Sequence, residues 1–410
     1  MLYSKKILFT VVGLNLLHVE HLSCFIHTLQ LVINDAIFSQ RSVKDLIANC
    51  RKIVSHFAHS ATACHKLENI QGTMGLPKHK LIQDVSTRWN STLQMLERIL
   101  EQKTALTNYA ADNDIPVLGA YNYQMMEFII RVLKPFEIVT LMCSSNKEIS
   151  SCIIPQVATL KKYLSKPGND SGVQTLKKEL ESSLDRRFGG TVNNINTDDR
   201  FLRISTFLDP RFKDAFFTSS VRETTMKDIV HELLLLDERD DDSAQIELLE
   251  ASGSEHSRNL SLSEQEQEPK RSLESEINED FWSCFEGSKR EESSDESDNN
   301  TQAENERTRS RISSSGAKKK KEFYTAEIHK YMQLPAINRD EDPINWWKKN
   351  VDKLASLKPV VLKYLSAPPS SAASERLFST AGHICNDLRN RLLPDNADRL
   401  IFVSSNRHLL

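Results

Sequence analysis

Apolar residues recur at helical spacing along most of this chain, and the pattern predicts a mainly α-helical protein. The first apolar face consists of Leu22, Phe25, Ile26, Leu29, Val32, Ile33 and Ile37. The same spacing returns after Trp89. Two further helices are expected over 150–165 and 173–188, because a Lys-Pro-Gly run between them ends a helix and favours a turn. One more helix is expected over 222–236.

The C-terminal part continues this pattern. Trp346 and Trp347 open an apolar face directly after an Asp-Pro pair, and a Pro-Pro pair ends it. Ser370 or Ser371 is then a good N-cap for the next helix. The apolar side of that helix is formed by Leu377, Phe378, Ala381, Ile384, Cys385 and Leu388. A final short helix is expected over 396–406.

The composition changes between residues 237 and 322. Residues 237–321 hold 13 basic and 23 acidic residues, a net charge of −10 in a chain whose total is −3. Such a stretch cannot bury enough apolar surface to offset the entropy of ordering it, so we expect a disordered insert. Phe281, Trp282 and Phe285 form an apolar island there that is a candidate docking helix. Lys318 to Lys321 could be a nuclear-import signal, although such runs also occur in charged linkers.

Cysteine usage and hydropathy exclude several classes of protein. Seven thinly spread cysteines argue against a disulfide-stapled secreted scaffold. The apolar run 7–17 is not followed by a small-residue cleavage site, so a buried strand is favoured there over a secretory signal. No apolar stretch is long enough to cross a bilayer. We therefore expect no membrane partner, and nothing points to a cofactor or a small-molecule substrate.

Three groups of residues could carry chemistry. Cys24 and His27 could supply half of a zinc site, and the alternative is a buried thiol and a hydrogen-bonded histidine. Trp89 beside Arg88 could stack an unpaired base and hold its phosphate, and the alternative is a tryptophan in the core. Glu375 could ligate a metal ion for phosphoryl transfer, or it could compensate the dipole at the start of a helix.

Four sequence blocks resemble one known family. They are HLSCFIHTLQLVI at 21–33, QDVSTRWNSTLQMLERI at 83–99, FLDPRFK at 207–213 and YLSAPPSSAASERLFSTAG at 364–382. In this order they are similar to blocks of hAT-superfamily transposases and of the domesticated BED zinc-finger proteins derived from them. The resemblance extends over roughly residues 18–410.

This resemblance implies a ribonuclease-H-like core interrupted by a large all-helical insertion and followed by C-terminal hAT dimerisation helices. In that family two Asp and one Glu hold divalent metal ions, and Glu375 matches the Glu. Trp89 matches the tryptophan that stabilises a flipped base in active relatives. Residues 1–20 contain no Asp, so we expect only a truncated remnant of the core, without the two Asp ligands and without a BED finger. A two-metal site with one carboxylate is not expected to work, and we predict no enzymatic activity.

The chain is thus predicted to have four parts. They are an apolar lead-in with a remnant strand (1–20), a helical insertion-type domain (21–236), the acidic insert (237–322) and the dimerisation region (323–410). We predict a non-catalytic, nuclear, hAT-derived protein that self-associates as a homodimer or larger oligomer. The expected dimerisation or core residues are Trp346, Trp347, Leu377, Phe378, Leu400, Ile401 and Phe402.

The alternative is a DNA-binding remnant transposase or transcription regulator. Its candidate DNA contacts are Arg88, Trp89, Arg389 and Arg391, since arginine suits phosphate and Trp89 offers a flat ring. The net charge of −3 ranks this alternative second, because the acidic insert competes with phosphate for the same arginines.

Overall fold

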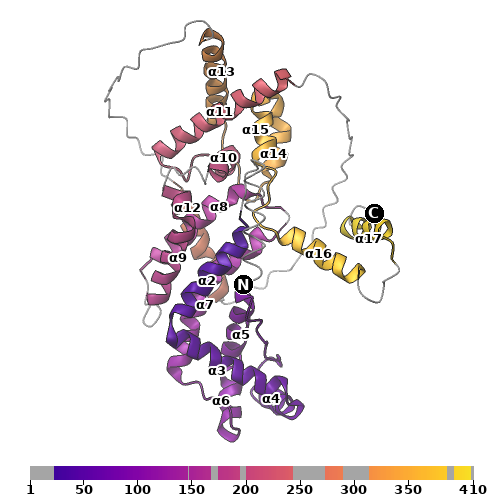
Figure 1. Cartoon of the computed structure of the whole chain (residues 1–410). Helices are drawn as coiled ribbons and strands as arrows, with labels where there is room; N and C mark the ends of the chain where they lie inside the picture. The colour runs from indigo at the N-terminus through magenta and orange to yellow at the C-terminus, as the bar shows by residue number, and fades with distance from the viewer. Residues whose placement is uncertain are drawn as a thin grey trace.

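A computed structural model describes residues 23–145, 147–167, 174–193, 200–242, 273–289, 314–385 and 392–407. Within these ranges the protein is helical and has no β-strand, which confirms the mainly α prediction (Figure 1). The strand expected within 1–20 lies outside the described residues. The helices are α2 (Phe25–Ser39), α3 (Arg41–Ala58), α4 (Ala61–Thr73), α5 (Trp89–Glu101), α6 (Lys103–Asp112), α7 (Ala120–Cys143), η1 (Ser150–Cys152), α8 (Ile153–Ser165), α9 (Gln174–Asn193), α10 (Arg200–Leu208), α11 (Ser219–Asp242), α12 (Leu273–Ser288), α13 (Ser314–Gln333), α14 (Pro343–Asn350), η3 (Val351–Leu357), α15 (Lys358–Tyr364), α16 (Ala372–Ile384) and α17 (Pro394–Ser405).

The helices form an elongated body from which α16 and α17 project sideways (Figure 1). Helices α3, α4 and α6 lie at one end of the body, and α11, α13, α14 and α15 lie at the other. One cluster of buried apolar residues runs through the body from Phe25 to Leu365. Within the described residues, α16 and α17 contribute nothing to this cluster.

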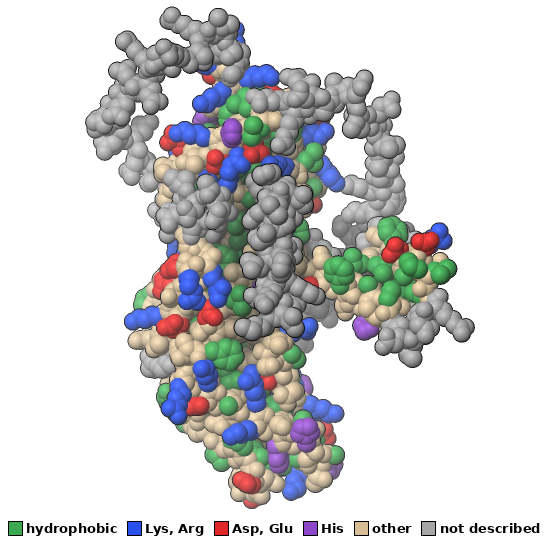
Figure 2. Space-filling view, viewed as in Figure 1, with side chains coloured by type: hydrophobic (Ala, Val, Ile, Leu, Met, Phe, Trp, Pro, Cys, Tyr) green, Lys and Arg blue, Asp and Glu red, His purple; other side chains and the backbone are tan. Residues whose placement is uncertain are grey.

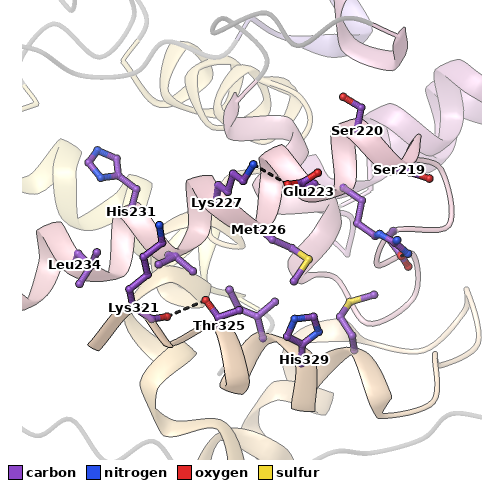
Figure 3. A pocket seen from close by; sticks show the side chains of 15 residues that line it. Ser219, Ser220, Glu223, Met226, Lys227, His231, Leu234, Lys321, Thr325 and His329 are labelled. Carbon is purple, nitrogen blue, oxygen red and sulfur yellow. Dashed lines mark hydrogen bonds and ion pairs between the residues drawn. The ribbon is translucent and has the colours of Figure 1, made fainter. Parts of the chain in front are cut away.

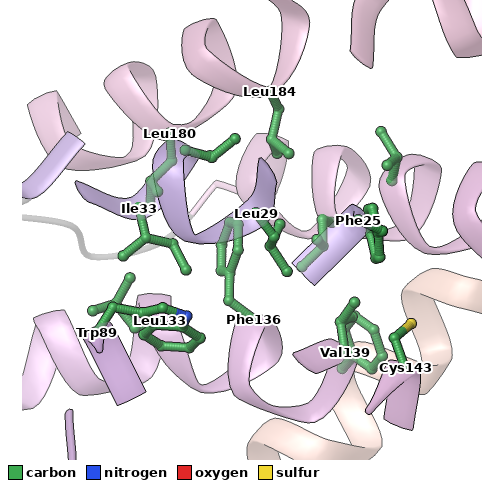
Figure 4. Close-up of a cluster of buried hydrophobic side chains, with 14 of the residues drawn as sticks. Phe25, Leu29, Ile33, Trp89, Leu133, Phe136, Val139, Cys143, Leu180 and Leu184 are labelled. Atoms are coloured by element: carbon green, nitrogen blue, oxygen red, sulfur yellow. The ribbon is translucent and has the colours of Figure 1, made fainter. Parts of the chain in front are cut away.

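Helix α2 is the centre of the first half of the body. Its apolar face was expected from the sequence, and Phe25, Leu29 and Ile33 are buried on it. Figure 4 shows α9 on one side of this helix, with Leu180 and Leu184, and α7 on the other. Because α2 is covered on both sides, it needs apolar residues over a wider arc than a surface helix does.

The FLDPRFK block is held in place by the C-terminal part of the body. The Trp347 indole nitrogen donates to the carbonyl of Leu208 at 2.8 Å, and the Tyr331 hydroxyl donates to the carbonyl of Phe207 at 3.0 Å. The Tyr331 and Trp347 rings stack with their centroids 5.2 Å apart. Residues 207–213 and 331–347 therefore form one core, although more than 100 residues separate them in the sequence.

A buried ion network lies beside this contact. Asp209 is fully buried, and its carboxylate accepts hydrogen bonds from Arg211 at 2.9 Å and from the Ser151 hydroxyl at 2.5 Å. Arg211 also reaches Glu148 at 3.3 Å. Burial by itself would lower the pKa of Arg211, but the Asp209 and Glu148 carboxylates outweigh it and raise that pKa. The guanidinium thus stays charged in the core, and its two acids are its counterions.

The acidic insert contains a packed helix, which corrects the expectation of disorder for these residues. Helix α12 packs against α8 and α7, and Phe281 and Phe285 are buried. The Phe285 ring lies 5.5 Å from that of Phe216, and Arg339 stacks 3.8 Å above the ring of Trp282. The apolar island that the sequence indicated as a candidate docking helix is the packed face of α12. Residues 243–272 and 290–313 of the insert lie outside the described residues.

We expect Asp209→Ala to lower the free energy of unfolding by about 3–5 kcal/mol, because it leaves the Arg211 guanidinium buried without its main counterion. Urea unfolding followed by circular dichroism measures this. Asp45→Ala is the control, because Asp45 pairs with Arg41 at 3.7 Å on the surface and its loss should cost less than about 1 kcal/mol. Equal midpoints for the two variants would contradict the prediction.

Candidate functional site

Helices α16 and α17 form an arm whose apolar residues face solvent. No residue of α16 is buried, and Ala397 is the only buried residue that α17 has within the described part of the chain. Phe378 is 74% exposed and Phe402 is 69% exposed. Leu377, Leu400 and Val403 are exposed as well. Figure 2 shows these hydrophobic side chains gathered on the projecting end of the molecule.

The apolar faces of these two helices are therefore not covered by the residues that the structure describes. Helices α16 and α17 contact each other, yet their apolar faces remain in water. Each square ångström of apolar surface removed from water contributes roughly 25 cal/mol, so covering both faces would be favourable. An exposed, contiguous apolar surface of this kind is typical of a protein–protein contact. The expected apolar residues Leu377, Phe378, Leu400 and Phe402 are all on this surface, and Ile401 is half-buried there.

The base of the arm is attached to the body by polar contacts. The Ser370 hydroxyl donates to the carbonyl of Cys143 at 3.0 Å, and the Arg376 guanidinium donates to the carbonyl of Ser144 at 2.8 Å. The backbone nitrogen of Ser371 donates to the thiol sulfur of Cys24 at 3.3 Å. These contacts join three distant parts of the sequence, and they set the direction in which α16 leaves the body. The sequence offered no signal for Cys143 or Ser144 as part of this site.

Glu375 lies in the first turn of α16, exposed to solvent. Its carboxylate accepts a hydrogen bond from the Ser371 hydroxyl at 2.7 Å. A negative charge in the first turn of a helix is favourable there, as the second interpretation of this residue expected. Ser371 occupies the N-cap position, but its side chain makes no hydrogen bond to the first backbone N–H groups of the helix. Among the described residues, no three His, Cys, Asp or Glu side chains are grouped so that they could hold a metal ion.

Within the described residues, Cys24 and His27 are not joined by further Cys, His, Asp or Glu side chains that would complete a zinc site, and His56 and Cys64 have other partners. Cys24 is the N-cap residue of α2 and is half-buried, and His27 is exposed. His56 is hydrogen-bonded to the Tyr109 hydroxyl at 2.9 Å, and the Cys64 thiol donates to the carbonyl of Phe57 at 3.1 Å. The Cys24 thiol instead contacts the base of the arm, which is a structural role that the spacing of the motif did not predict.

The structure corrects the base-stacking interpretation of Trp89. Its side chain is 4% exposed and lies beside Leu133 in the core, where no base can stack on it (Figure 4). Arg88 is exposed and occupies the N-cap position of α5. The other two arginines of the predicted DNA contact, at positions 389 and 391, lie outside the described residues.

The same block contains an ion pair that the sequence reading missed. The Arg51 guanidinium donates to both carboxylate oxygens of Asp84, at 2.7 Å to Oδ2 and 3.1 Å to Oδ1, and the Thr92 hydroxyl donates to Oδ2 at 3.0 Å. Asp84 thus connects the segment before α5 to α3 through Arg51 and to α5 itself through Thr92. Arg51 precedes Asp84 by 33 residues, so no local pattern could have indicated the pair.

The two tryptophans expected in the dimerisation region or the core belong to the body. Trp347 is 3% exposed, and Trp346 is half-buried with its ring 5.1 Å from that of Trp347. Asp342 caps their helix by accepting a hydrogen bond from the backbone nitrogen of Ile344 at 2.8 Å. Single apolar side chains such as Leu362 and Phe323 are exposed on α15 and α13, but within the described residues of the C-terminal region the grouped exposed apolar surface is on α16 and α17.

Comparison with known proteins connects this geometry to a family. Residues 22–118 match the ZBED1 RNase-like helical domain, and residues 327–407 match the hAT family C-terminal dimerisation region. The chain is 27% identical over 403 residues to human zinc finger BED domain-containing protein 4, covering 97% of this chain and 30% of that protein. It is 26% identical over 393 residues to mouse zinc finger BED domain-containing protein 6, covering 94% of this chain and 37% of that protein.

A more distant likeness is to a Zea mays protein named as an AC transposase, at 22% identity over 93% of this chain and 43% of that protein. The chain thus spans about a third of the length of the BED-domain relatives. These matches confirm the resemblance to hAT-derived proteins of the BED type. No helix among the described residues is both long and apolar enough to cross a membrane.

We expect Trp89→Ala to lower the free energy of unfolding by about 3–5 kcal/mol, because it leaves a cavity where the indole packs. Arg88→Ala, one residue away on the surface, should change it by less than about 0.5 kcal/mol. Chemical denaturation of the two variants beside the unaltered chain measures both effects. If Trp89→Ala were as stable as the unaltered protein, the placement of the ring in the core would be wrong.

Proposed function

This chain resembles hAT-derived BED-type proteins over nearly its whole length, and we propose that it acts by pairing with a second copy of itself through α16 and α17. The exposure of Phe378 and Phe402 carries this proposal. The dimerisation-region match covers 327–407, but its first part, up to α15, is buried in the body of this chain. The arm is the part of the matched region that keeps an apolar face for a partner.

The arm of a second copy can cover the apolar surface of α16 and α17, because every copy of the chain presents the same surface. A two-fold pair places the same patch on both sides of the interface, so that apolar residues meet apolar residues. Stable interfaces bury about 800 Å² per partner, which is within reach of two helices that each present an apolar face. The polar contacts of Ser370 and Arg376 hold the arm in a fixed direction, which lowers the entropic cost of association.

The role that we propose is non-catalytic. In this sequence Glu375 is the acid that matches the metal-binding set of the family, and its carboxylate is engaged by Ser371. We propose action in the nucleus, for which the names of the BED-domain relatives and the exposed run Lys318 to Lys321 on α13 are the support. Microscopy of the tagged full chain in cells tests this location, and exclusion from the nucleus would reject it.

DNA binding is the second candidate function, and the relative named as an AC transposase favours it. With Trp89 in the core, exposed Arg88 is the described residue of the predicted contact that could reach phosphate. Such binding would rest on charge and would weaken as the salt concentration rises.

We expect the full chain to be a dimer or larger oligomer at micromolar concentration in sedimentation velocity. The double variant Phe378→Ser, Phe402→Ser should be monomeric, because it removes the two largest exposed apolar side chains of the arm. Phe323→Ser is the matched control, since Phe323 is 57% exposed on α13, outside the arm, and its loss should leave the sedimentation unchanged. A strictly monomeric unaltered chain would reject the proposal.

We expect the full chain to leave hairpin-ended DNA uncut in the presence of Mg²⁺ or Mn²⁺, because no described acids are grouped with Glu375 as a two-metal site needs. Products resolved on a denaturing gel report cleavage, and a mobility shift at low salt reports binding. Cleavage that is lost in Glu375→Gln would overturn the non-catalytic role. A shift that weakens in Arg88→Ala would support the second candidate, whereas no shift at low salt would reject it.

A further inference from the structure

A groove with a cavity of about 1080 Å³ lies between α11 and α13, at the end of the body that is remote from α3 and α4 (Figures 1 and 3). One face of each helix lines it. On α11 the lining residues recur every three or four positions from Ser219 to Leu234, and on α13 they do so from Lys321 to Met332. Two helix faces side by side make an elongated groove, the shape that accepts a third helix.

The floor of this groove is apolar and adaptable. Val230 and Ile328 are buried at its base, and Met226, Leu234 and Met332 are half-buried along it. Figure 3 shows Met226 directed toward the α13 side. Methionine side chains are flexible and polarisable, so they fit apolar partners of differing shape. The floor can therefore take apolar side chains from an incoming helix.

The rim of the groove carries a small excess of positive charge. Lys321 is exposed there, and its side chain forms no ion pair with any other residue that the structure describes. The other charged rim residues are paired, Lys227 with Glu223 at 2.7 Å and Arg222 with Asp214 at 3.4 Å. An adjoining hollow of about 500 Å³ shares Lys321 and adds Lys318 and Glu322. An acidic ligand is the electrostatic complement of this rim.

We propose that the groove between α11 and α13 binds a short amphipathic helix of a partner protein, with apolar residues on its inner face and acidic residues beside them. The apolar side chains would lie over Met226, Val230 and Ile328. An acidic side chain would meet Lys321. A nucleic acid is a poorer occupant, because a phosphate backbone has no apolar side chains to bury against Met226, Val230 and Ile328.

This site is separate from the arm, so a partner could bind while α16 and α17 are engaged with a second copy. The lining residues of the groove belong to α11, α13 and the segment that precedes α11. None of them is on α16 or α17. The inference therefore does not depend on the proposed self-association, and each can fail without the other.

The test uses the full chain and a fluorescein-labelled synthetic peptide of about 15 residues, with Leu on one helical face and Glu on both flanks. Fluorescence anisotropy should show saturable binding. A peptide with Lys in place of every Glu, and one with Ala in place of every Leu, should each bind at least about tenfold more weakly, because they lose the charge complementarity or the apolar anchors.

Lys321→Glu should weaken binding of the acidic peptide by roughly fivefold or more, since it replaces an attraction by a repulsion. Lys319→Glu is the matched control, because Lys319 is exposed on the same helix but lines neither hollow, and it should bind like the unaltered chain. Equal effects of the two substitutions would overturn the proposal. So would the absence of binding to the full chain, which is also the result expected if the chain's own acidic insert fills the groove.

Discussion

The buried charge of Arg211 is the constraint on which the arrangement of the body depends. Its guanidinium is compensated by Asp209 and Glu148, and Asp209 also accepts from Ser151. Next to Ser151, the backbone nitrogen of Ser150 donates to the carbonyl of Ala367, just before the arm. The segment 148–151, the FLDPRFK block and the approach to α16 are thus positioned together. A buried ion pair is only a modest source of stability, but a misplaced one is costly, so it selects a single arrangement.

The aromatic contacts around Tyr331 and Trp347 reinforce this arrangement from the C-terminal side. Both side chains donate hydrogen bonds to backbone carbonyls of 207–208, so their polar atoms are satisfied where their rings are buried. This packing divides the helices of the C-terminal region into two groups. Helices α13 to α15 complete the core of the same chain, whereas α16 and α17 leave it with their apolar faces uncovered.

Two surfaces with different chemistry result from this division. The arm is apolar and lacks a covering layer, which suits a copy of the same chain. The groove between α11 and α13 combines an apolar floor with a positive rim, which suits a ligand of opposite charge. The fixed base of the arm, with Ser370 held by the carbonyl of Cys143, keeps the first surface away from the body.

The sequence by itself determined the helical class, most of the helices and the apolar faces of α2 and α16, because helical periodicity is a local property. Local pattern could not place Trp89, since a tryptophan at a helix start can stack on a ligand or enter a core, and only packing against Leu133 decided between them. The sequence indicated the apolar island of α12, but only the structure showed that it packs against α7 and α8.

The tertiary structure alone decided which apolar faces are covered. The patterns of α2 and α16 look alike in the sequence, yet α2 packs between α7 and α9 while no residue of α16 is buried. The pairs Arg51–Asp84, Ser370–Cys143 and Trp347–Leu208 likewise join residues far apart in the chain. Periodicity fixes which side of a helix must leave water, but the partner that covers it is set by the path of the whole chain or by another molecule.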